Sequence, residues 1–319
     1  SAGAIDYPTY SLEATDGDLN SSKALWDIAI EGFTHDNYYK AMGLNPDGSV
    51  NPTYPKYLDP DNLISYMMVI YFSANRDGPA SLSPTDDRIN NFFGIFNRKN
   101  PDGFKYCIHD NETAYLSLND DITNSPVIAG WTFDRFNPMW LHLRLLENPD
   151  YKQKFADLAY KYLYNDGVLS AERNISRFQK RVDMIDEAIV GESARWGNIN
   201  NGRPYTRNRT WKPVINYLLE TYFPQRTQIV IDQFKRKGWL NDLIPPTFDE
   251  SQFKSSEKGI LIKDSHFKLI NNNSSGQIYY TTDNTDPRAS GGAVAESAIL
   301  YSTEINVSGT VFLKARVKN

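Results

Sequence analysis

The chain has 319 residues, a formal net charge of −5 and a single cysteine, Cys107. One cysteine excludes an intrachain disulfide framework and a multi-cysteine zinc site, and the negative charge argues against nucleic acid as a partner. Composition is that of a globular protein, with 40% hydrophobic and 23% charged residues, and no apolar run approaches the roughly 20 residues that span a bilayer.

The first 245 residues are predicted to be mostly helical. One helix is expected over 21–43, where two serines precede an amphipathic stretch and a glycine follows it. A second is expected over 59–72, opening with Asp59-Pro60, a capping residue followed by proline at the first helical position. Because this second helix is apolar on nearly all sides, we expect it to be central.

A β-hairpin is predicted next. Residues 91–98 and 104–110 are rich in aromatic and β-branched side chains, and the Asn-Pro-Asp-Gly sequence at 100–103 has the residue chemistry of a type I turn. Cys107 lies among apolar residues of the second strand. We therefore expect its side chain to be buried, as a small hydrophobic group.

Helical periodicity resumes after the hairpin. A long helix beginning at Ser170 has apolar residues that step by three and four, which predicts a buried face. A helix that begins at Trp211 is expected to end at Pro224, because proline cannot donate a backbone hydrogen bond. Glu192 and Arg195 are interpreted as a buried ion pair, with a substrate-binding edge as the alternative. The apolar steps are Ile175, Phe178, Val182, Ile185 and Ile189.

The periodicity changes near the C-terminus. Residues 246–256 have the composition of a linker, and short apolar strands separated by Asn, Ser and Gly turns follow over 257–319. The expected fold class is therefore multi-domain α+β, with a mostly helical domain over 1–245 and a small β-sandwich at the end.

Three polar side chains are predicted to converge at one end of the hairpin. Asn91 begins its first strand and Asp110 ends its second, and antiparallel pairing places these positions together. The central helix ends just before Asp77. Oxygen ligands of this kind suit Mg²⁺, Mn²⁺ or Ca²⁺. An Asp, an Asn and an Asp occur in this order in protein kinases, where they orient the acceptor hydroxyl and hold the metal ions.

The spacing departs from that pattern. Asp77 and Asn91 are 14 residues apart (91 − 77 = 14), whereas protein kinases have about five, so residues 81–88 are expected to loop out. Two alternatives remain open: Asp and Asn at helix and strand ends are commonly caps and turn formers, and the pair Asp77/Asp110 would also suit a glycosidase.

Several segments resemble the spore-coat-protein-H (CotH) kinase-like family, in particular its large Bacteroides-type members. The resemblance covers roughly residues 20–240, as the C-terminal portion of the family's kinase module. The segments are YLDPDNLISYMMVIYFSANRDGP (57–79), NNFFGIFNR (90–98), FKYCIHDNE (104–112), SPVIAGW, the GVLSAE segment (167–172), VGESARWG (190–197) and YFPQRT (222–227).

This resemblance implies an atypical protein kinase fold for the helical domain, resembling a kinase C-lobe. Asp77 would be the catalytic aspartate, Asn91 and Asp110 would bind the metal and ATP, and Glu112 would be an accessory metal ligand. Mg²⁺ (or Mn²⁺) and ATP would be the cofactors. Gly78 stands where the family often has Trp. Residues 1–56 contain neither a glycine-rich loop nor a strand set with a nucleotide-binding lysine, so the small nucleotide lobe is expected to be absent and this portion inactive by itself.

The last segment resembles another module. GQIYYTTDNTDPR (276–288) and VFLKARV (311–317) look like the chitobiase/β-hexosaminidase C-terminal domain, which implies an immunoglobulin-like sandwich. Asp283 and Asp286 are expected to cap a tight turn there, which is also a candidate Ca²⁺ site.

The leading functional hypothesis is Mg²⁺- and ATP-dependent phosphoryl transfer to a protein hydroxyl. The alternative is a non-catalytic binding or scaffolding protein of the cell surface, associated with a glycan or a protein. By resemblance, we expect a secreted, cell-surface or periplasmic monomer.

Overall fold

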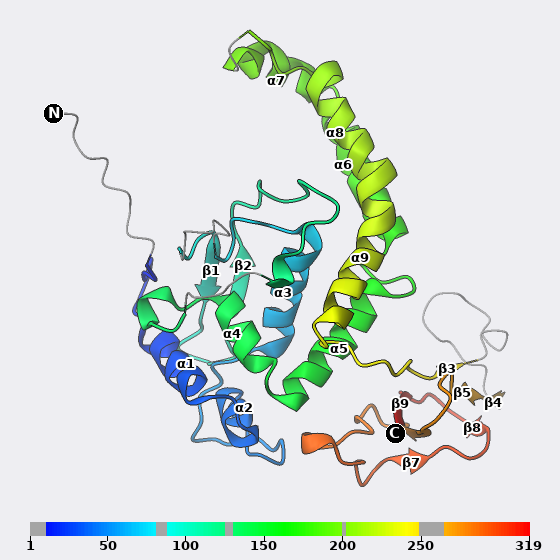
Figure 1. Cartoon of the computed structure of the whole chain (residues 1–319). Coiled ribbons are helices and arrows are strands. Elements are labelled where there is room, and N and C mark those ends of the chain that lie inside the picture. Colours follow the sequence, from blue (N-terminus) through cyan, green and yellow to red (C-terminus); the bar gives the residue numbers. More distant parts are fainter. Residues whose placement is uncertain (1–10, 81–87, 125–129, 200–201, 249–264) are drawn as a thin grey trace. The chain divides into compact units, whose positions relative to one another are not determined.

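A computed structural model describes residues 11–80, 88–124, 130–199, 202–248 and 265–319. Contacts divide the chain into two units, Ser1–Leu240 and Asn241–Asn319 (Figure 1). Of the predicted linker at 246–256, Thr247–Phe248 forms strand β3, which pairs with β5 (Leu269–Ile270); residues 249–256 lie outside the described part.

The helix predicted over 21–43 is two helices, α1 (Asn20–Glu31) and α2 (His35–Ala41). The chain turns at Gly32, whose φ of 101° is readily accessible to glycine. Thr34 then begins α2, because its side chain accepts a 3.2 Å hydrogen bond from the backbone N–H of Asn37. The single-helix prediction was wrong because this second cap was overlooked.

Helix α3 (Pro60–Ser73) is the central element, as predicted. The carboxylate of Asp59 caps its first turn by accepting a 3.1 Å hydrogen bond from the N–H of Asn62. The helix packs against α4 (Pro138–Leu145), α5 (Pro149–Leu163), α9 (Phe223–Arg236) and the hairpin, and most of its side chains are buried. The end of α3 is therefore held within the core on several sides.

The predicted hairpin is present as β1 (Phe92–Ile95) and β2 (Lys105–Ile108), beside α3 (Figure 1). Tyr106 faces inward and is buried against Tyr66 of α3. Cys107 is exposed, which corrects the prediction that it is buried. The reason is strand parity: successive side chains point to opposite faces, so the inward position of Tyr106 places Cys107 outside.

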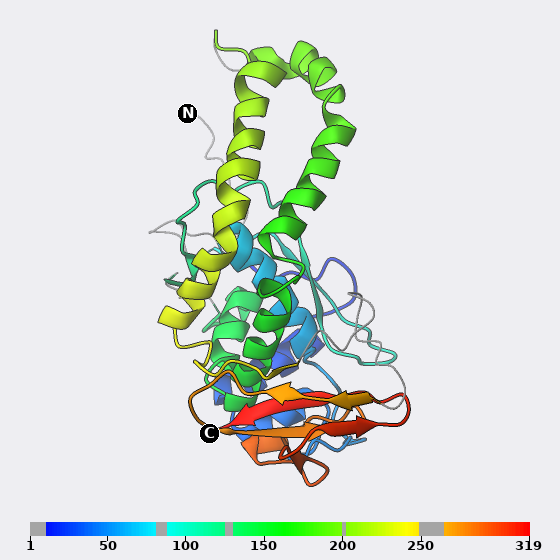
Figure 2. The same ribbon diagram turned by 90° about the vertical axis from the view of Figure 1, so that its right-hand side faces the viewer.

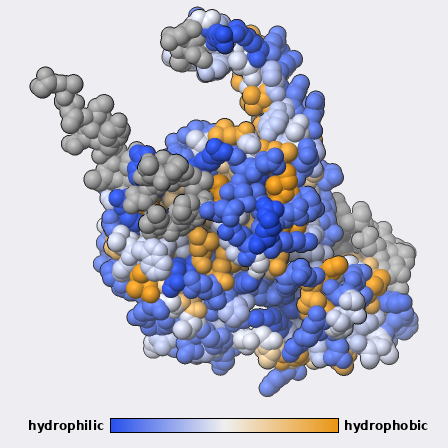
Figure 3. Space-filling model, in the orientation of Figure 1, coloured by the Kyte–Doolittle hydropathy of each residue, from blue (hydrophilic) through white to orange (hydrophobic). Residues whose placement is uncertain are grey.

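An arm of helices projects from the first unit (Figures 1 and 2). It comprises α6 (Ala171–Ile185), α7 (Ala188–Trp196), α8 (Lys212–Tyr217) and α9 (Phe223–Arg236). Two π-helical segments, Arg207–Trp211 and Leu218–Tyr222, adjoin α8. Figure 3 shows the surface of the arm as mostly hydrophilic, with a few hydrophobic residues. Short 3-10 helices elsewhere are Ile122–Asn124, Phe133–Arg135, Gly197–Ile199 and Ser290–Gly292.

The structure of this arm differs from three predictions. The apolar stripe on α6 is buried only in part: Ile175 and Phe178 pack on the core and Val182 is buried, but Ile185 near the far end of the helix is 43% exposed. Glu192 and Arg195 are both exposed, so they form no buried ion pair. Pro224 does not end the helix: it is the second residue of α9, and the wider π-helical turn directly before it accommodates the ring.

A cluster of aromatic rings packs between α3 and the helices α4, α5 and α9. Phe155 of α5 is fully buried, and its ring centroid lies 5.1 Å from that of Phe234 and 5.3 Å from that of His142. Trp239 and Tyr71 join the same cluster. His142 is itself fully buried, with Nδ1 2.7 Å from the hydroxyl of Tyr151. This cluster fixes α3 against α4, α5 and α9.

We expect His142 to make the free energy of unfolding fall on acidification. Burial lowers its pKa from 6.5 to about 3. Between these values the unfolded chain binds a proton that the folded chain does not, so this contribution is fully present above pH 6.5 and is lost toward pH 3. At about pH 5 the loss is about 2 kcal/mol.

Urea unfolding at about pH 7.5 and about pH 5 measures this loss. His142→Phe should remove about 2 kcal/mol of the pH dependence, whereas the exposed control His109→Gln should retain it. An identical pH dependence in wild type and His142→Phe would contradict the assignment.

The second unit contains short antiparallel strands around a small apolar core. Strand β6 (Gln277–Thr281) lies between β7 (Ile299–Leu300) and β9 (Lys314–Lys318), and β4 (Ser265–Phe267) pairs with β8 (Ile305–Val307). The turn prediction is confirmed, because the carboxylates of Asp283 and Asp286 accept hydrogen bonds from the N–H groups two residues on. Asp286 also accepts two hydrogen bonds from Arg316, at 2.6 and 2.7 Å.

In the described ranges, no helix combines the length and apolarity needed to cross a membrane.

Candidate functional site

The backbone turns sharply after α3, and a buried asparagine stabilises the turn. Ala74 adopts the left-handed conformation and ends the helix. Asn75 is 1% exposed, and its Oδ1 accepts hydrogen bonds from the N–H of Asp77 at 2.9 Å and from the hydroxyl of Thr113 at 2.8 Å. Asn75 therefore joins the loop that carries Asp77 to the segment that follows the hairpin.

The side chain of Asp77 lies against the start of the hairpin. Its Oδ2 accepts a 3.0 Å hydrogen bond from Nδ2 of Asn91 and a 3.1 Å hydrogen bond from Nδ2 of Asn90. The same Nδ2 of Asn91 lies 3.0 Å from the backbone oxygen of Asp77. The side-chain amides of Asn90 and Asn91 thus orient the carboxylate of Asp77, which lies 13 and 14 positions earlier in the sequence.

Asp110 lies beside Asn91 at the open end of the hairpin, before β1 and after β2, which we call the hairpin mouth. Nδ2 of Asn91 lies 3.4 Å from the backbone oxygen of Asp110. Both residues have positive φ, 52° for Asn91 and 48° for Asp110. Asn and Asp tolerate this left-handed conformation better than other residues that have a side chain. The hydrogen bonds of Asn91 to Asp77 and to the backbone of Asp110 bring the three residues together.

Gly78 is packed between the two asparagines. A Cβ at this position would lie 3.2 Å from Nδ2 of Asn75 and 3.2 Å from Cβ of Asn91. Such contacts are tighter than ordinary van der Waals packing, so a side chain here would require its neighbours to shift by a few tenths of an ångström. The resembled family often has Trp at this position. Here the absence of a side chain at Gly78 leaves room for Asn91 to lie close to Asp77.

The donor atoms at the hairpin mouth fit a hard cation. Nδ2 of Asn91 donates to Asp77, so Oδ1 of the same Asn91 amide is the atom that can bind a metal ion. The Asp110 side chain is exposed, and its carboxylate has no ion-pair partner among the described residues. The side-chain oxygen of Asn111 is buried and accepts no hydrogen bond within the described chain. Oxygen atoms of this kind are the ligands of Mg²⁺ and Mn²⁺.

Two observations limit the predicted metal set. No group of three or more His, Cys, Asp or Glu side chains is arranged for a metal ion within the described ranges, so the candidate set depends on the amide of Asn91. Glu112 is exposed in the turn after Asp110, and the contacts of the described residues do not connect it to Asp77 or Asn91.

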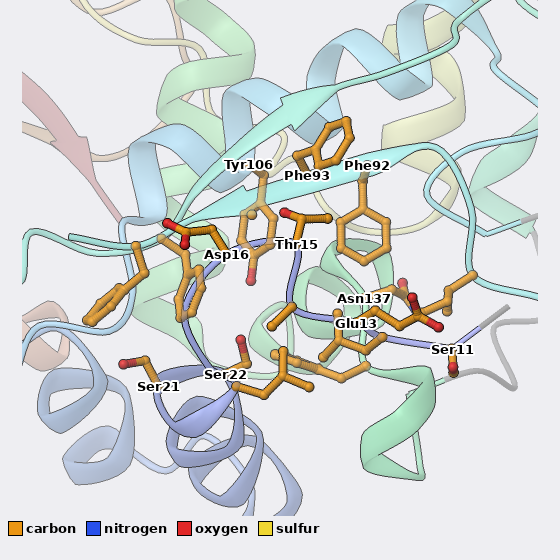
Figure 4. A pocket seen from close by; sticks show the side chains of 18 of the residues that line it. Ser11, Glu13, Thr15, Asp16, Ser21, Ser22, Phe92, Phe93, Tyr106 and Asn137 are labelled. Carbon is orange, nitrogen blue, oxygen red and sulfur yellow. The ribbon is translucent and has the colours of Figure 1, made fainter. Parts of the chain in front are cut away.

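A pocket of about 390 Å³ adjoins this cluster (Figure 4). It lies between the segment at 11–22 and the hairpin, and Asn90, Asn91 and Phe92 form part of its wall. Figure 4 shows the Tyr106 side chain directed into the pocket. Burial raises the pKa of Tyr106 well above its usual value, so its hydroxyl is neutral at physiological pH.

Sequence reasoning missed two residues of the site. Asn75 and Asn90 make contacts that the order of Asp77, Asn91 and Asp110 does not imply. The available signal was local: each is a polar residue next to an apolar segment, at the end of α3 and before β1. Such positions are so often occupied by caps that the pattern alone does not identify a site.

Two family models match the chain. The family described as CotH kinase protein matches residues 20–230, about two thirds of the chain, and the chitobiase/beta-hexosaminidase C-terminal domain matches residues 257–319. The chain belongs to the CotH kinase family and continues into a chitobiase/beta-hexosaminidase C-terminal domain. Neither the curated proteins nor the solved structures gave a significant match.

Proposed function

We propose that the helical unit is the catalytic lobe of a Mg²⁺- and ATP-dependent kinase that phosphorylates a protein hydroxyl group. One observation carries the proposal: the side-chain amide of Asn91 bonds to the carboxylate of Asp77 and reaches the backbone of Asp110. Phosphoryl transfer depends chiefly on positioning and charge stabilisation. Asp77 would position the acceptor hydroxyl, and Asn91 and Asp110 would hold the metal ion that neutralises the phosphate charge. Membership of the CotH kinase family supports the same reaction class.

Asp77 would act on the acceptor. The amides of Asn90 and Asn91 orient its carboxylate by donating hydrogen bonds to Oδ2, and this carboxylate would accept a hydrogen bond from the acceptor hydroxyl. The hydroxyl proton would pass to Asp77 as the hydroxyl oxygen bonds to the γ-phosphorus, and the bond from that phosphorus to the bridging oxygen breaks to release ADP.

Asn91 and Asp110 would hold the metal. Bound Mg²⁺ supplies neutralisation of the phosphate charge during the transfer. The chain contributes the orientation of its ligands: Asp77 fixes the Asn91 amide through Nδ2, and Nδ2 of Asn91 also reaches the backbone oxygen of Asp110 at 3.4 Å. Glu112 would be an accessory ligand.

Metal titration tests the assignment. We expect Asp110→Ala to weaken Mn²⁺ binding at least about tenfold, because a negatively charged ligand is lost. Asp102→Ala is a matched control, since Asp102 lies in the turn at the other end of the hairpin, 3.3 Å from the Lys105 ammonium. Isothermal titration of both variants measures the difference. Equal, weak binding by wild type and Asp110→Ala would reject the metal site and favour a non-catalytic binding or scaffolding role at the cell surface.

The proposed setting is the cell envelope or the outside of the cell, with a protein substrate or a surface glycan or protein as the partner and the monomer as the working state. Support comes from the chitobiase/beta-hexosaminidase C-terminal domain that follows the kinase domain.

A further inference from the structure

Arg226 is a buried cation that donates hydrogen bonds to four backbone carbonyl groups and lies 5.6 Å from the centroid of the Tyr222 ring. It lies on α9 within the YFPQRT segment, and it is 0% exposed. Its Nη2 donates to the oxygen of Tyr71 at 2.7 Å and its Nε to that of Phe72 at 2.8 Å. Its Nη1 donates to the oxygens of Leu118 at 2.8 Å and Asp120 at 2.9 Å.

These carbonyls belong to two segments, the end of α3 and the segment after the hairpin, which the N–H of Tyr115 also joins by a 2.8 Å hydrogen bond to the oxygen of Ser73. Tyr71 and Phe72 are in the last turn of α3, where carbonyls have few partners within the helix; the oxygen of Tyr71 also accepts a 3.3 Å hydrogen bond from the N–H of Ala74. A cation there also interacts favourably with the negative end of the helix dipole. Leu118 and Asp120 follow the hairpin. The guanidinium therefore connects the end of α3 to the segment after the hairpin through a single rigid group.

Neighbouring side chains strengthen both halves of this connection. The Tyr222 hydroxyl donates to the oxygen of Phe72 at 3.0 Å, and Nε2 of Gln233 donates to the oxygen of Asp120 at 3.0 Å. The carboxylate of Asp120 pairs with Arg76, the residue before Asp77. Both routes from Arg226 therefore reach the loop of Asp77: one through the end of α3, the other through Asp120 and Arg76.

We infer that Arg226 is a positioning residue for Asp77. By fixing the end of α3 relative to the segment after the hairpin, it holds Asp77 against Asn91 and Asp110. This role in catalysis rests on the proposed kinase function, whereas the effect on the geometry of the Asp77 loop does not. A shift of about 1 Å in a catalytic group is enough to cost about a hundredfold in rate.

Arg226→Lys is the test variant, because lysine keeps the charge but cannot form the planar set of four hydrogen bonds. Arg236→Lys is the matched control: Arg236 lies on the same helix and is exposed, and it pairs with the side chain of Asp121. Tyr222→Phe is a milder second variant that removes only one donor to Phe72. Hydrogen exchange of peptides covering 70–78 and 115–121 reports the geometry, and kcat and KM for ATP of the complete protein report the reaction.

Arg226→Lys should raise exchange at 70–78 about tenfold and lower kcat about 10- to 100-fold, with KM for ATP changed less than about twofold. Tyr222→Phe should change the same peptide to a smaller extent, and Arg236→Lys should resemble wild type. Unchanged exchange at 70–78 in both Arg226→Lys and Tyr222→Phe would overturn the inference, as would an equal rise throughout the unit. Locally raised exchange in a protein whose wild type transfers no phosphate would uphold the positioning and reject the kinase function.

Discussion

Replacing Asp77 with asparagine is expected to slow phosphoryl transfer by the complete protein about a thousandfold, within the range that general base catalysis contributes. Asparagine retains one oxygen that can accept the hydrogen bonds from Asn90 and Asn91. The geometry at the hairpin mouth should therefore survive, while the group that accepts the hydroxyl proton is lost. Initial rates of transfer from radiolabelled ATP at saturating Mg²⁺ measure the effect.

Asp61→Asn is the control for this variant. Asp61 lies in the first turn of α3, at the opposite end of the helix that precedes Asp77, and it pairs with Lys154 at 2.9 Å. Its replacement should leave the rate within about twofold of wild type, because an exposed ion pair contributes little to stability. A rate for Asp77→Asn close to that of Asp61→Asn would exclude Asp77 as the catalytic residue.

The largest effect on stability is expected for Phe155→Ala, which should lower the free energy of unfolding by about 3–5 kcal/mol. Phe155 is fully buried and contacts His142, Phe234 and Trp239. The close packing of these rings leaves little freedom to collapse into the space that the variant creates, so both transfer energy and packing are lost. Urea denaturation followed by tryptophan fluorescence measures the change.

Phe93→Ala is the matched control, because Phe93 on β1 is 44% exposed. It should lower the free energy of unfolding by less than about 1 kcal/mol, since nearly half of its surface is already in water. If both variants lost the same free energy, the aromatic cluster between α3 and the helices α4, α5 and α9 would not be the main stabilising core of this unit.

The parts of the fold that could be predicted are those that local patterns determine. The apolar stretch after Asp59-Pro60 indicated a central helix, and two aromatic strands around a turn indicated the hairpin; both are present. The meeting of Asn91 and Asp110 followed from antiparallel pairing alone. The family and the C-terminal domain were recognisable from short motifs, and the matched families confirm them.

The features that could not be predicted depend on distant contacts. Pro224 normally ends a helix, but a π-helical turn absorbs it here. The apolar stripe of α6 indicated burial, but the far end of the arm projects beyond the core, so Ile185 remains exposed. No prediction was made for Arg226, because only the fold shows the four carbonyls that surround it.

Anomalous diffraction from crystals soaked in Mn²⁺ tests the central claim most directly. The account predicts one strong peak at the hairpin mouth, at a ligand distance of about 2.0–2.4 Å from Oδ1 of Asn91 and from the Asp110 carboxylate, with Asp77 adjacent. Absence of a peak at saturating Mn²⁺, or a peak elsewhere that leaves these two side chains without a cation, would contradict it.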